Sequence, residues 1–272
     1  MNFWILLLLA IVQGITEFLP ISSSGHTVLL NNIFGINNNI KLLSILLHIA
    51  TLLSVLVFYR KELITLLKHP LCNTNKKIIT TTIFTCLIVL ILRPLINKTF
   101  DGNYIFVFFI ITAFLLFIGD YMADKRDFLS NNETCKTNAN TFKQYDITNI
   151  PITYKQSIII GITQGIACIP GISRSGSTIA IGQICGAKDT ARYSFLISIP
   201  IIIASFVLEL FDGGLSNISI PTTSLIISMI VCFAIGLVCI KYMTILVRKN
   251  KMALFGYYLL AISTILVILS FF

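Results

Sequence analysis

Charged residues are scarce in this sequence: Asp, Glu, Lys and Arg make up only 11% of its 272 residues. A soluble globular domain carries about a quarter charged residues, so this composition excludes one. Hydrophobic residues make up 56%, and the mean hydropathy is +0.90. The sequence therefore predicts an integral membrane protein.

Other absences narrow the class further. None of the seven cysteines belongs to a CxxC pair, so we interpret them as small buried hydrophobic residues. The amino-terminal segment lacks a basic leader and a small-residue cleavage site, and no cleaved signal peptide is expected. The net charge of +9 does not indicate nucleic-acid binding, because the basic residues fall in short gaps between apolar runs. That distribution is typical of cytoplasmic membrane loops.

Six apolar segments are long enough to cross a bilayer, which takes about 20 residues per helix. These predicted spans are residues 42–59, 78–96, 104–123, 193–211, 222–241 and 252–271. Residues 124–155 are hydrophilic, and we expect a loosely ordered cytoplasmic linker there. Regions 1–35 and 156–187 are apolar at both ends but interrupted by Pro, Gly and Ser. Each predicts a re-entrant helix hairpin, whose irregular backbone must be buried in protein or line a wet cavity.

An internal repeat relates the two hairpins. Residues 13–27 (QGITEFLPISSSGHT) align with 164–178 (QGIACIPGISRSGST) without a gap, and eight of the fifteen positions are identical. Each repeat, 1–123 and 156–272, then holds one hairpin and three spans, so the second copy enters the membrane upside down. The predicted fold is a single all-α membrane domain, 1–272, with six spans and two re-entrant hairpins arranged as an inverted repeat.

The basic residues predict the orientation. If the Arg60–Lys77 loop is cytoplasmic, the linker and the basic loops after residues 187 and 240 are cytoplasmic too. Only Lys41, Arg93 and Lys98 then fall on the outer face, and both termini lie there as well.

The first hairpin carries the first candidate motif. Glu17 is the only acid among the first 61 residues, and an intramembrane carboxylate is expected to be partnered or functional. Gln13 shares its helix face. The remaining candidates of this motif are Ser22, Ser23, Ser24, Gly25 and His26. We interpret His48, alone in an apolar span, as a packing histidine.

The second hairpin carries a cation. Arg174 is the only basic residue between Lys155 and Lys188, and its planar guanidinium suits phosphate oxygens. Gly171 and Gly176 permit close backbone approach to a ligand. The hydroxyls of this motif belong to Ser173, Ser175, Ser177 and Thr178.

Together the two motifs favour phosphoryl transfer. Either Ser22 or Ser23 could be the nucleophile, with Glu17 or His26 activating it, and direct attack by water is an alternative. A divalent cation, Mg²⁺ or Ca²⁺, could bridge Glu17 and a diphosphate.

At these residues the chain resembles the undecaprenyl-diphosphatase family, the bacitracin-resistance phosphatases. QGITEFLPISSSGH resembles the family's (E/Q)xxxE and SSxGH segments, PGISRSGST resembles its PGxSRSxxT motif, and AKDTARYSFLISIP resembles a further family stretch. The resemblance implies hydrolysis of undecaprenyl diphosphate to undecaprenyl phosphate and inorganic phosphate, which recycles the lipid carrier for cell-wall synthesis. It also implies a divalent metal, bacitracin resistance and a site open to the outer face of the bacterial cytoplasmic membrane.

The resemblance assigns catalytic roles to Glu17, Ser23 and His26, and phosphate binding to Arg174. The family's first acid position is Gln13 here, so a metal would depend on Glu17 and substrate oxygens. The polyprenyl diphosphate and the bilayer are the expected partners, and a homodimer is among the oligomeric states left open.

Two rival classes remain. A transporter for phosphorylated lipids would share the broken helices and the inverted repeat, but it needs no general base. The acid-phosphatase-like lipid phosphatases share the Ser24-Gly25-His26 core, yet they need a histidine after the arginine, and none follows Arg174. A purely structural scaffold would not require a buried Glu17 and Arg174.

Overall fold

The computed structural model describes residues 2–35, 40–99, 102, 104–133, 146–211 and 221–269. Within these ranges the chain is all-α, as predicted, with eleven α-helices and one short 3-10 helix. The helices are α1 (Phe3–Thr16), α2 (Ser23–Phe34), α3 (Ile40–Phe58), α4 (Arg60–Lys68), α5 (Asn73–Thr99), α6 (Ile105–Glu133), η1 (Ile147–Asn149), α7 (Tyr154–Ile166), α8 (Arg174–Ile184), α9 (Thr190–Phe211), α10 (Thr222–Arg248) and α11 (Ala253–Leu269).

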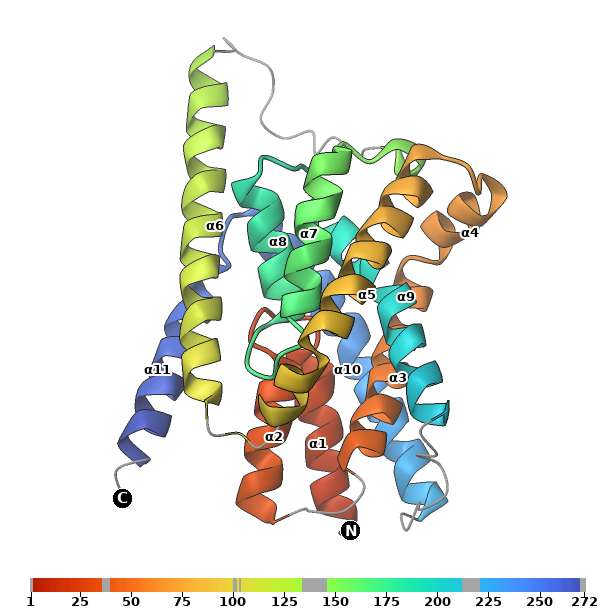
Figure 1. Ribbon diagram of the computed structural model, residues 1–272, viewed down its shortest axis with the longest axis vertical. Coiled ribbons are helices and arrows are strands. Elements are labelled where there is room, and N and C mark those ends of the chain that lie inside the picture. Colours follow the sequence, from red (N-terminus) through yellow and green to blue (C-terminus); the bar gives the residue numbers. More distant parts are fainter. Residues whose placement is uncertain are drawn as a thin grey trace.

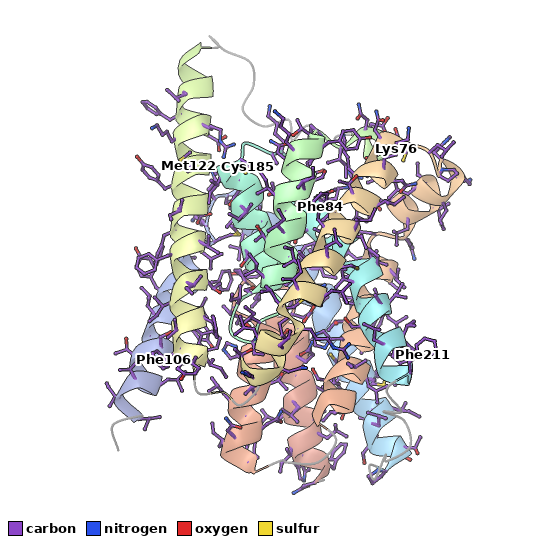
Figure 2. The ribbon with its side chains drawn as sticks, viewed as in Figure 1. Lys76, Phe84, Phe106, Met122, Cys185 and Phe211 are labelled. Atoms are coloured by element: carbon purple, nitrogen blue, oxygen red, sulfur yellow. The ribbon has the colours of Figure 1, made fainter. Side chains whose placement is uncertain are left out.

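The outer surface of this bundle is apolar. Leu90 and Ile91 on α5 are 66% and 70% exposed, and Phe211 at the end of α9 is 83% exposed. Figure 2 shows such carbon-rich side chains projecting around the bundle. A soluble monomer rarely exposes large contiguous apolar patches, so the surface agrees with the predicted membrane class.

Helix length gives a coarser count of crossings than the six predicted spans. Among the described residues, α5, α6, α9 and α10 are long and apolar enough to cross a bilayer. A fifth crossing is obtained if α3 and α4, which meet at a bend of 76°, are taken as one. The sixth predicted span corresponds to α11, whose 17 described residues make a shorter apolar helix.

The two hairpins are built alike and point at each other. The helices of the first hairpin, α1 and α2, begin at residues 3 and 23, and those of the second, α7 and α8, begin at 154 and 174. Both helix starts are thus shifted by the same 151 residues as the sequence repeat. In Figure 1 the α1–α2 hairpin enters from one end of the molecule and the α7–α8 hairpin from the other, and their turns meet in the middle.

Each hairpin packs against the opposite half of the chain, α1 on α10 and α7 on α5. Two equivalent glycines permit these close approaches. A Cβ added to Gly14 would lie 2.8 Å from the Cys232 carbonyl oxygen on α10, and one added to Gly165 would lie 2.6 Å from Ile88 Cβ on α5. Each hairpin is therefore buried mainly by helices of the other half.

Helix α6 corrects the predicted linker. We expected loosely ordered chain from residue 124, but α6 continues to Glu133. A helix does not have to end where the bilayer ends, and polar contacts hold this extension: Asn250 Nδ2 donates to Asp124 Oδ1 at 2.8 Å and to Asp127 Oδ2 at 3.0 Å. Residues 134–145 of the predicted linker lie outside the described residues.

Candidate active site

Glu17 lies directly after α1, where the first hairpin turns. Its side chain is only 5% exposed as a residue, so its charge needs partners. Oε2 accepts hydrogen bonds from Gln13 Nε2 at 3.0 Å and from Ser23 Oγ at 2.6 Å. The predicted pairing of Gln13 and Glu17 on one helix face is confirmed, and Ser23 joins them from the start of α2.

Arg174 brings the second hairpin to this carboxylate. It is the first residue of α8, and its Nη2 forms an ion pair with Glu17 Oε1. The structure therefore unites two motifs that lie 157 residues apart in the chain. A carboxylate, a hydroxyl and a guanidinium now meet at the ends of two broken helices.

The first turn is locked to the second by Ser22. Its φ of 67° lies in the left-handed region, where a non-glycine residue is strained. Its Oγ accepts hydrogen bonds from the backbone N–H of Gly25 at 3.2 Å and of Gly171 at 3.1 Å. Because two amides occupy this oxygen, Ser22 holds the turns together, and the geometry favours Ser23 over Ser22 as the nucleophile.

The second turn also contacts the first through its serines. Ser173 caps α8, its Oγ accepting from Gly176 N–H at 3.1 Å, while Ser175 Oγ donates to the Leu19 carbonyl at 3.3 Å. Gly176 lies so close to the first turn that a Cβ there would be 2.8 Å from Pro20 Cβ. The two turns thus interlock through backbone groups on both sides.

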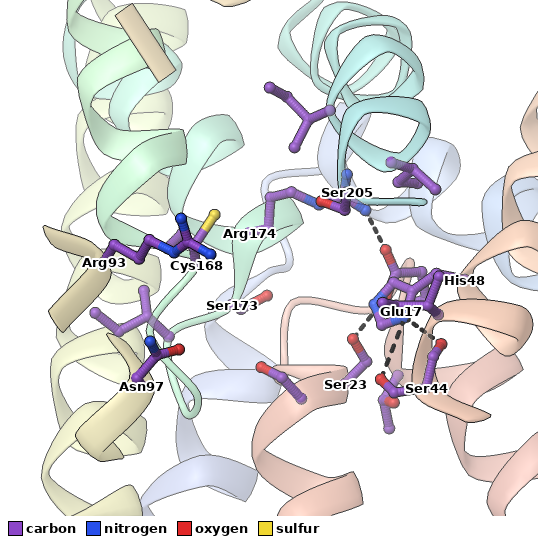
Figure 3. Close-up of a pocket in the computed structure, with 17 residues that line it drawn as sticks. Glu17, Ser23, Ser44, His48, Arg93, Asn97, Cys168, Ser173, Arg174 and Ser205 are labelled. Atoms are coloured by element: carbon purple, nitrogen blue, oxygen red, sulfur yellow. Dashed lines mark hydrogen bonds and ion pairs between the residues drawn. The ribbon is translucent and has the colours of Figure 1, made fainter. Parts of the chain in front are cut away.

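A cavity of about 390 Å³ opens beside these residues, within the usual size range of ligand pockets. Five predicted site residues line it: Glu17, Ser23, Ser24, Ser173 and Arg174. Figure 3 shows Glu17, Ser23 and Arg174 facing one another across it. The amino termini of α2 and α8 both end at this cavity, and their free amides and dipoles make it attractive to an anion.

The other predicted substrate-binding residues support the turns instead. Seven of them are not among the described residues that line the cavity: Gln13, Ser22, Gly25, Gly171, Ser175, Gly176 and Thr178. Thr178 is an example, because its hydroxyl bonds the Arg174 carbonyl at 2.8 Å and Ser194 Oγ at 2.6 Å inside the protein. These residues shape the site without reaching its ligand space.

His26 is placed differently from the prediction. Its Nδ1 lies 2.8 Å from the Ser22 carbonyl oxygen, and its Nε2 lies 3.0 Å from the Tyr258 hydroxyl. Because a carbonyl oxygen can only accept a hydrogen bond, Nδ1 is the donor to Ser22. Its ring stacks on that of Tyr258 on α11, with centroids 5.9 Å apart. These contacts hold His26 against α11, and it is not among the described residues that line the cavity.

His48 is the histidine that reaches the site, and the expectation of a simple packing role is wrong. Its Nε2 lies 3.3 Å from Glu17 Oε2, and its Nδ1 lies 2.6 Å from the Ser44 carbonyl oxygen. Since a carbonyl only accepts, Nδ1 carries a proton. The sequence offered one signal for this contact, a polar side chain inside an otherwise apolar span.

Further polar residues of the cavity were also missed. They are Thr16, Ser44, Arg93, Asn97, Cys168 and Ser205. Arg93 was counted only among the basic residues of the outer face, near the end of the predicted span 78–96, and α5, which continues to Thr99, places it in the cavity wall. An arginine in the same helix as the apolar run from residue 78 to 92 was the available signal.

The residues do not fit a preformed metal site. Among the described residues, no three His, Cys, Asp or Glu side chains are grouped to hold an ion. Glu17 is the one carboxylate among the described lining residues, and both its oxygens already accept protein hydrogen bonds. The Gln13 amide donates a hydrogen bond to Glu17, whereas a carboxylate at this position could have coordinated a metal ion. A divalent cation therefore stays a prediction in which the ligand itself supplies most of the oxygens.

Fold and site together define a multi-pass membrane protein with a buried acid, a hydroxyl and an arginine at an anion-attracting cavity. Residues 6–265 match the family described as bacitracin resistance protein BacA. The chain belongs to this family.

Curated relatives are similar over their full length. The undecaprenyl-diphosphatase of Carboxydothermus hydrogenoformans is 33% identical, covering 99% of this chain and 98% of its own length. Undecaprenyl-diphosphatase 4 of Bacillus thuringiensis (strain Al Hakam) is 34% identical, covering 100% and 98%. The undecaprenyl-diphosphatase of Halothermothrix orenii is 32% identical, covering 99% of each chain.

Proposed function

We propose that this protein is a phosphatase that hydrolyses undecaprenyl diphosphate to undecaprenyl phosphate and inorganic phosphate. The reaction recycles the lipid carrier for cell-wall synthesis and confers bacitracin resistance. The family and the names of its relatives support this function. The observation that carries it is the meeting of Glu17, Ser23 and Arg174 at one cavity between two helix amino termini.

In the proposed reaction, Arg174, Ser173 and the first amides of α8 bind the terminal phosphate. Glu17 Oε2 takes the proton of Ser23 Oγ, which lies 2.6 Å away, as that oxygen attacks the terminal phosphorus. The bond from this phosphorus to the bridging oxygen breaks, and the lipid monophosphate leaves. Water then hydrolyses the phosphoserine, which releases inorganic phosphate and restores Ser23.

The alternative is that Glu17 activates a water molecule directly, with Ser23 orienting it. Acid quenching during turnover of a substrate labelled with ³²P in its terminal phosphate separates the two routes. Label on Ser23 supports the covalent route, whereas an unlabelled protein that still releases phosphate supports attack by water. In both routes Glu17, rather than His26, is the base, because Glu17 contacts Ser23 and lines the cavity, whereas His26 is not among the described lining residues.

The membrane topology is part of the proposal: six spans and two re-entrant hairpins, with the basic loops in the cytoplasm. Figure 1 supports it, since α4 and the carboxyl end of α6 lie at the end opposite the two termini. The cavity is lined from the early turns of α3 (Ser44, His48) and the last turns of α5 (Arg93, Asn97), which lie away from the basic loops. The site then opens to the outer face. Labelling of intact cells with an impermeant thiol reagent, in a variant whose seven native cysteines are replaced, tests this: Lys98→Cys should react and Lys68→Cys should not.

Phosphate release from purified protein in detergent tests the function. Wild-type protein should release phosphate from undecaprenyl diphosphate, and a chelator should suppress this until Mg²⁺ or Ca²⁺ is restored. Retained activity in excess chelator would contradict the metal proposal alone. Folded protein that binds the lipid but releases no phosphate would favour the transporter. Light scattering of the same sample tests whether the protein is a homodimer.

His48→Ala should lower kcat by about 10- to 100-fold, because a hydrogen bond to a charged group contributes roughly 1.5–3 kcal/mol. His48 Nε2 contacts Glu17 Oε2 from α3, and because Nδ1 already donates to Ser44, donation to the carboxylate makes the ring an imidazolium that holds the base in position. His69→Ala is the matched control, since His69 is exposed and follows α4 at the basic end. A kcat for His48→Ala within about twofold of wild type would remove His48 from the machinery.

A further inference from the structure

A second arginine lines the cavity from the wall opposite Glu17. Arg93 and Asn97 lie one helical turn apart on α5, so they share a face. Both line the cavity that Glu17 and Arg174 line. Figure 3 shows Arg93 and Asn97 on one side, Glu17 and His48 on the other, and Ser173 between the two groups.

The position of Arg93 is costly unless it serves the cavity. It lies in a helix long and apolar enough to span a bilayer, where a charged residue is costly and rare. Charged residues within such helices face a wet cavity or a partner rather than lipid.

Arg93 also contributes to the charge of the cavity lining. Glu17 and Arg174 compensate each other in their ion pair. Of the other described lining residues, Arg93 is the one that adds a permanent charge. Helix α5 therefore brings a second guanidinium, besides that of Arg174, to the cavity lining.

A diphosphate has two phosphates that must be bound apart. The attacked phosphate belongs beside Ser23 and Arg174. The other phosphate stays on the lipid and needs donors of its own across the cavity. A guanidinium fork and an amide side by side provide such donors.

We propose that Arg93 and Asn97 form a second phosphate subsite, which binds the lipid-linked phosphate and selects diphosphates over monophosphates. This inference rests on the proposed function, because it assumes a diphosphate substrate. Arg93 is thus a binding residue that determines specificity and takes no part in proton transfer.

Steady-state kinetics with farnesyl diphosphate, a short soluble substrate, test the subsite. Arg93→Ala should raise KM by about 10- to 100-fold, with kcat within about threefold of wild type, and Asn97→Ala should raise it several-fold. Arg93→Lys, which keeps the charge without the fork, should fall between. The inhibition constant of inorganic phosphate, which occupies the Arg174 subsite, should not change. Lys98→Ala is the matched control, because Lys98 is an exposed cation on the same helix outside the described cavity lining.

An unchanged KM in folded Arg93→Ala and Arg93→Lys would overturn the subsite. A parallel rise in the phosphate inhibition constant would overturn it too, because Arg93 would then serve the attacked phosphate. Calorimetric binding of farnesyl diphosphate and farnesyl monophosphate to the slow Glu17→Gln variant gives a readout with little turnover: its roughly tenfold or larger preference for the diphosphate should disappear when Arg93→Ala is added. Wild-type protein without hydrolysis would refute the proposed function, whereas active wild type with unaffected Arg93 variants would refute the subsite alone.

Discussion

Arg174→Ala is expected to reduce phosphate release by at least about 10³-fold. Removing one donor that stabilises the transition-state charge commonly costs 10²–10³ in kcat, and arginines in phosphoryl transfer contribute up to about 10⁵. Arg174 is the charged group that the second motif brings to the cavity, at the start of α8. The measurement is kcat for undecaprenyl diphosphate with detergent-purified protein.

The same substitution leaves Glu17 buried without its cation, and breaking a buried pair costs about 3–5 kcal/mol of stability. The double variant Glu17→Gln, Arg174→Ala removes both charges and should recover much of the lost melting temperature while staying inactive. Arg60→Ala is the control for loss of a cation, because Arg60 is exposed at the start of α4. Folded Arg174→Ala protein with more than a tenth of wild-type kcat would show that the phosphate binds elsewhere.

Glu17→Gln is expected to lower kcat by about 10²- to 10⁴-fold, the usual contribution of a general base. The amide keeps the size of the side chain and its contact with Ser23 but cannot take the proton. It also removes the ion pair, so Arg174 is freed and KM need not rise. The measurement is a comparison of kcat and KM with those of wild type.

Glu62→Gln provides the matched control. This carboxylate also pairs with an arginine, at 3.5 Å from Arg192 Nη2, but it lies on α4 at the basic end. Its loss should leave kcat within about twofold. If Glu17→Gln were equally mild, proton transfer in this site would have to depend on another group.

The repeat in the sequence located the site because its matches were polar. Gln, Gly and Ser recur in register within apolar helices, and only a shared structural demand explains that. The demand is visible in Gly14 and Gly165, which lie against equivalent helices of opposite repeats. Polar residues at membrane depth are few, so Glu17 and Arg174 had few partners available other than each other.

The wall of the cavity could not be predicted in the same way. His48, Arg93 and Ser205 come from α3, α5 and α9, and their convergence depends on how these helices rotate and cross. Hydropathy shows that a segment spans the membrane, but it does not fix which face turns inward. His26 illustrates the converse. A motif fixes neighbours in sequence, but the packing of other helices decides which of them reach the cavity, and His26 is held against Tyr258 of α11.

The interlock between Ser22 and Gly171 makes the order of synthesis matter. While the ribosome is still translating the middle of the chain, the first hairpin has been synthesised but the second hairpin, against which it packs, has not. Glu17 therefore lacks its partner Arg174 at that stage. The protein therefore becomes able to hydrolyse its substrate only after the second half has been inserted into the membrane. A nascent or truncated chain in the membrane has no partly working stage.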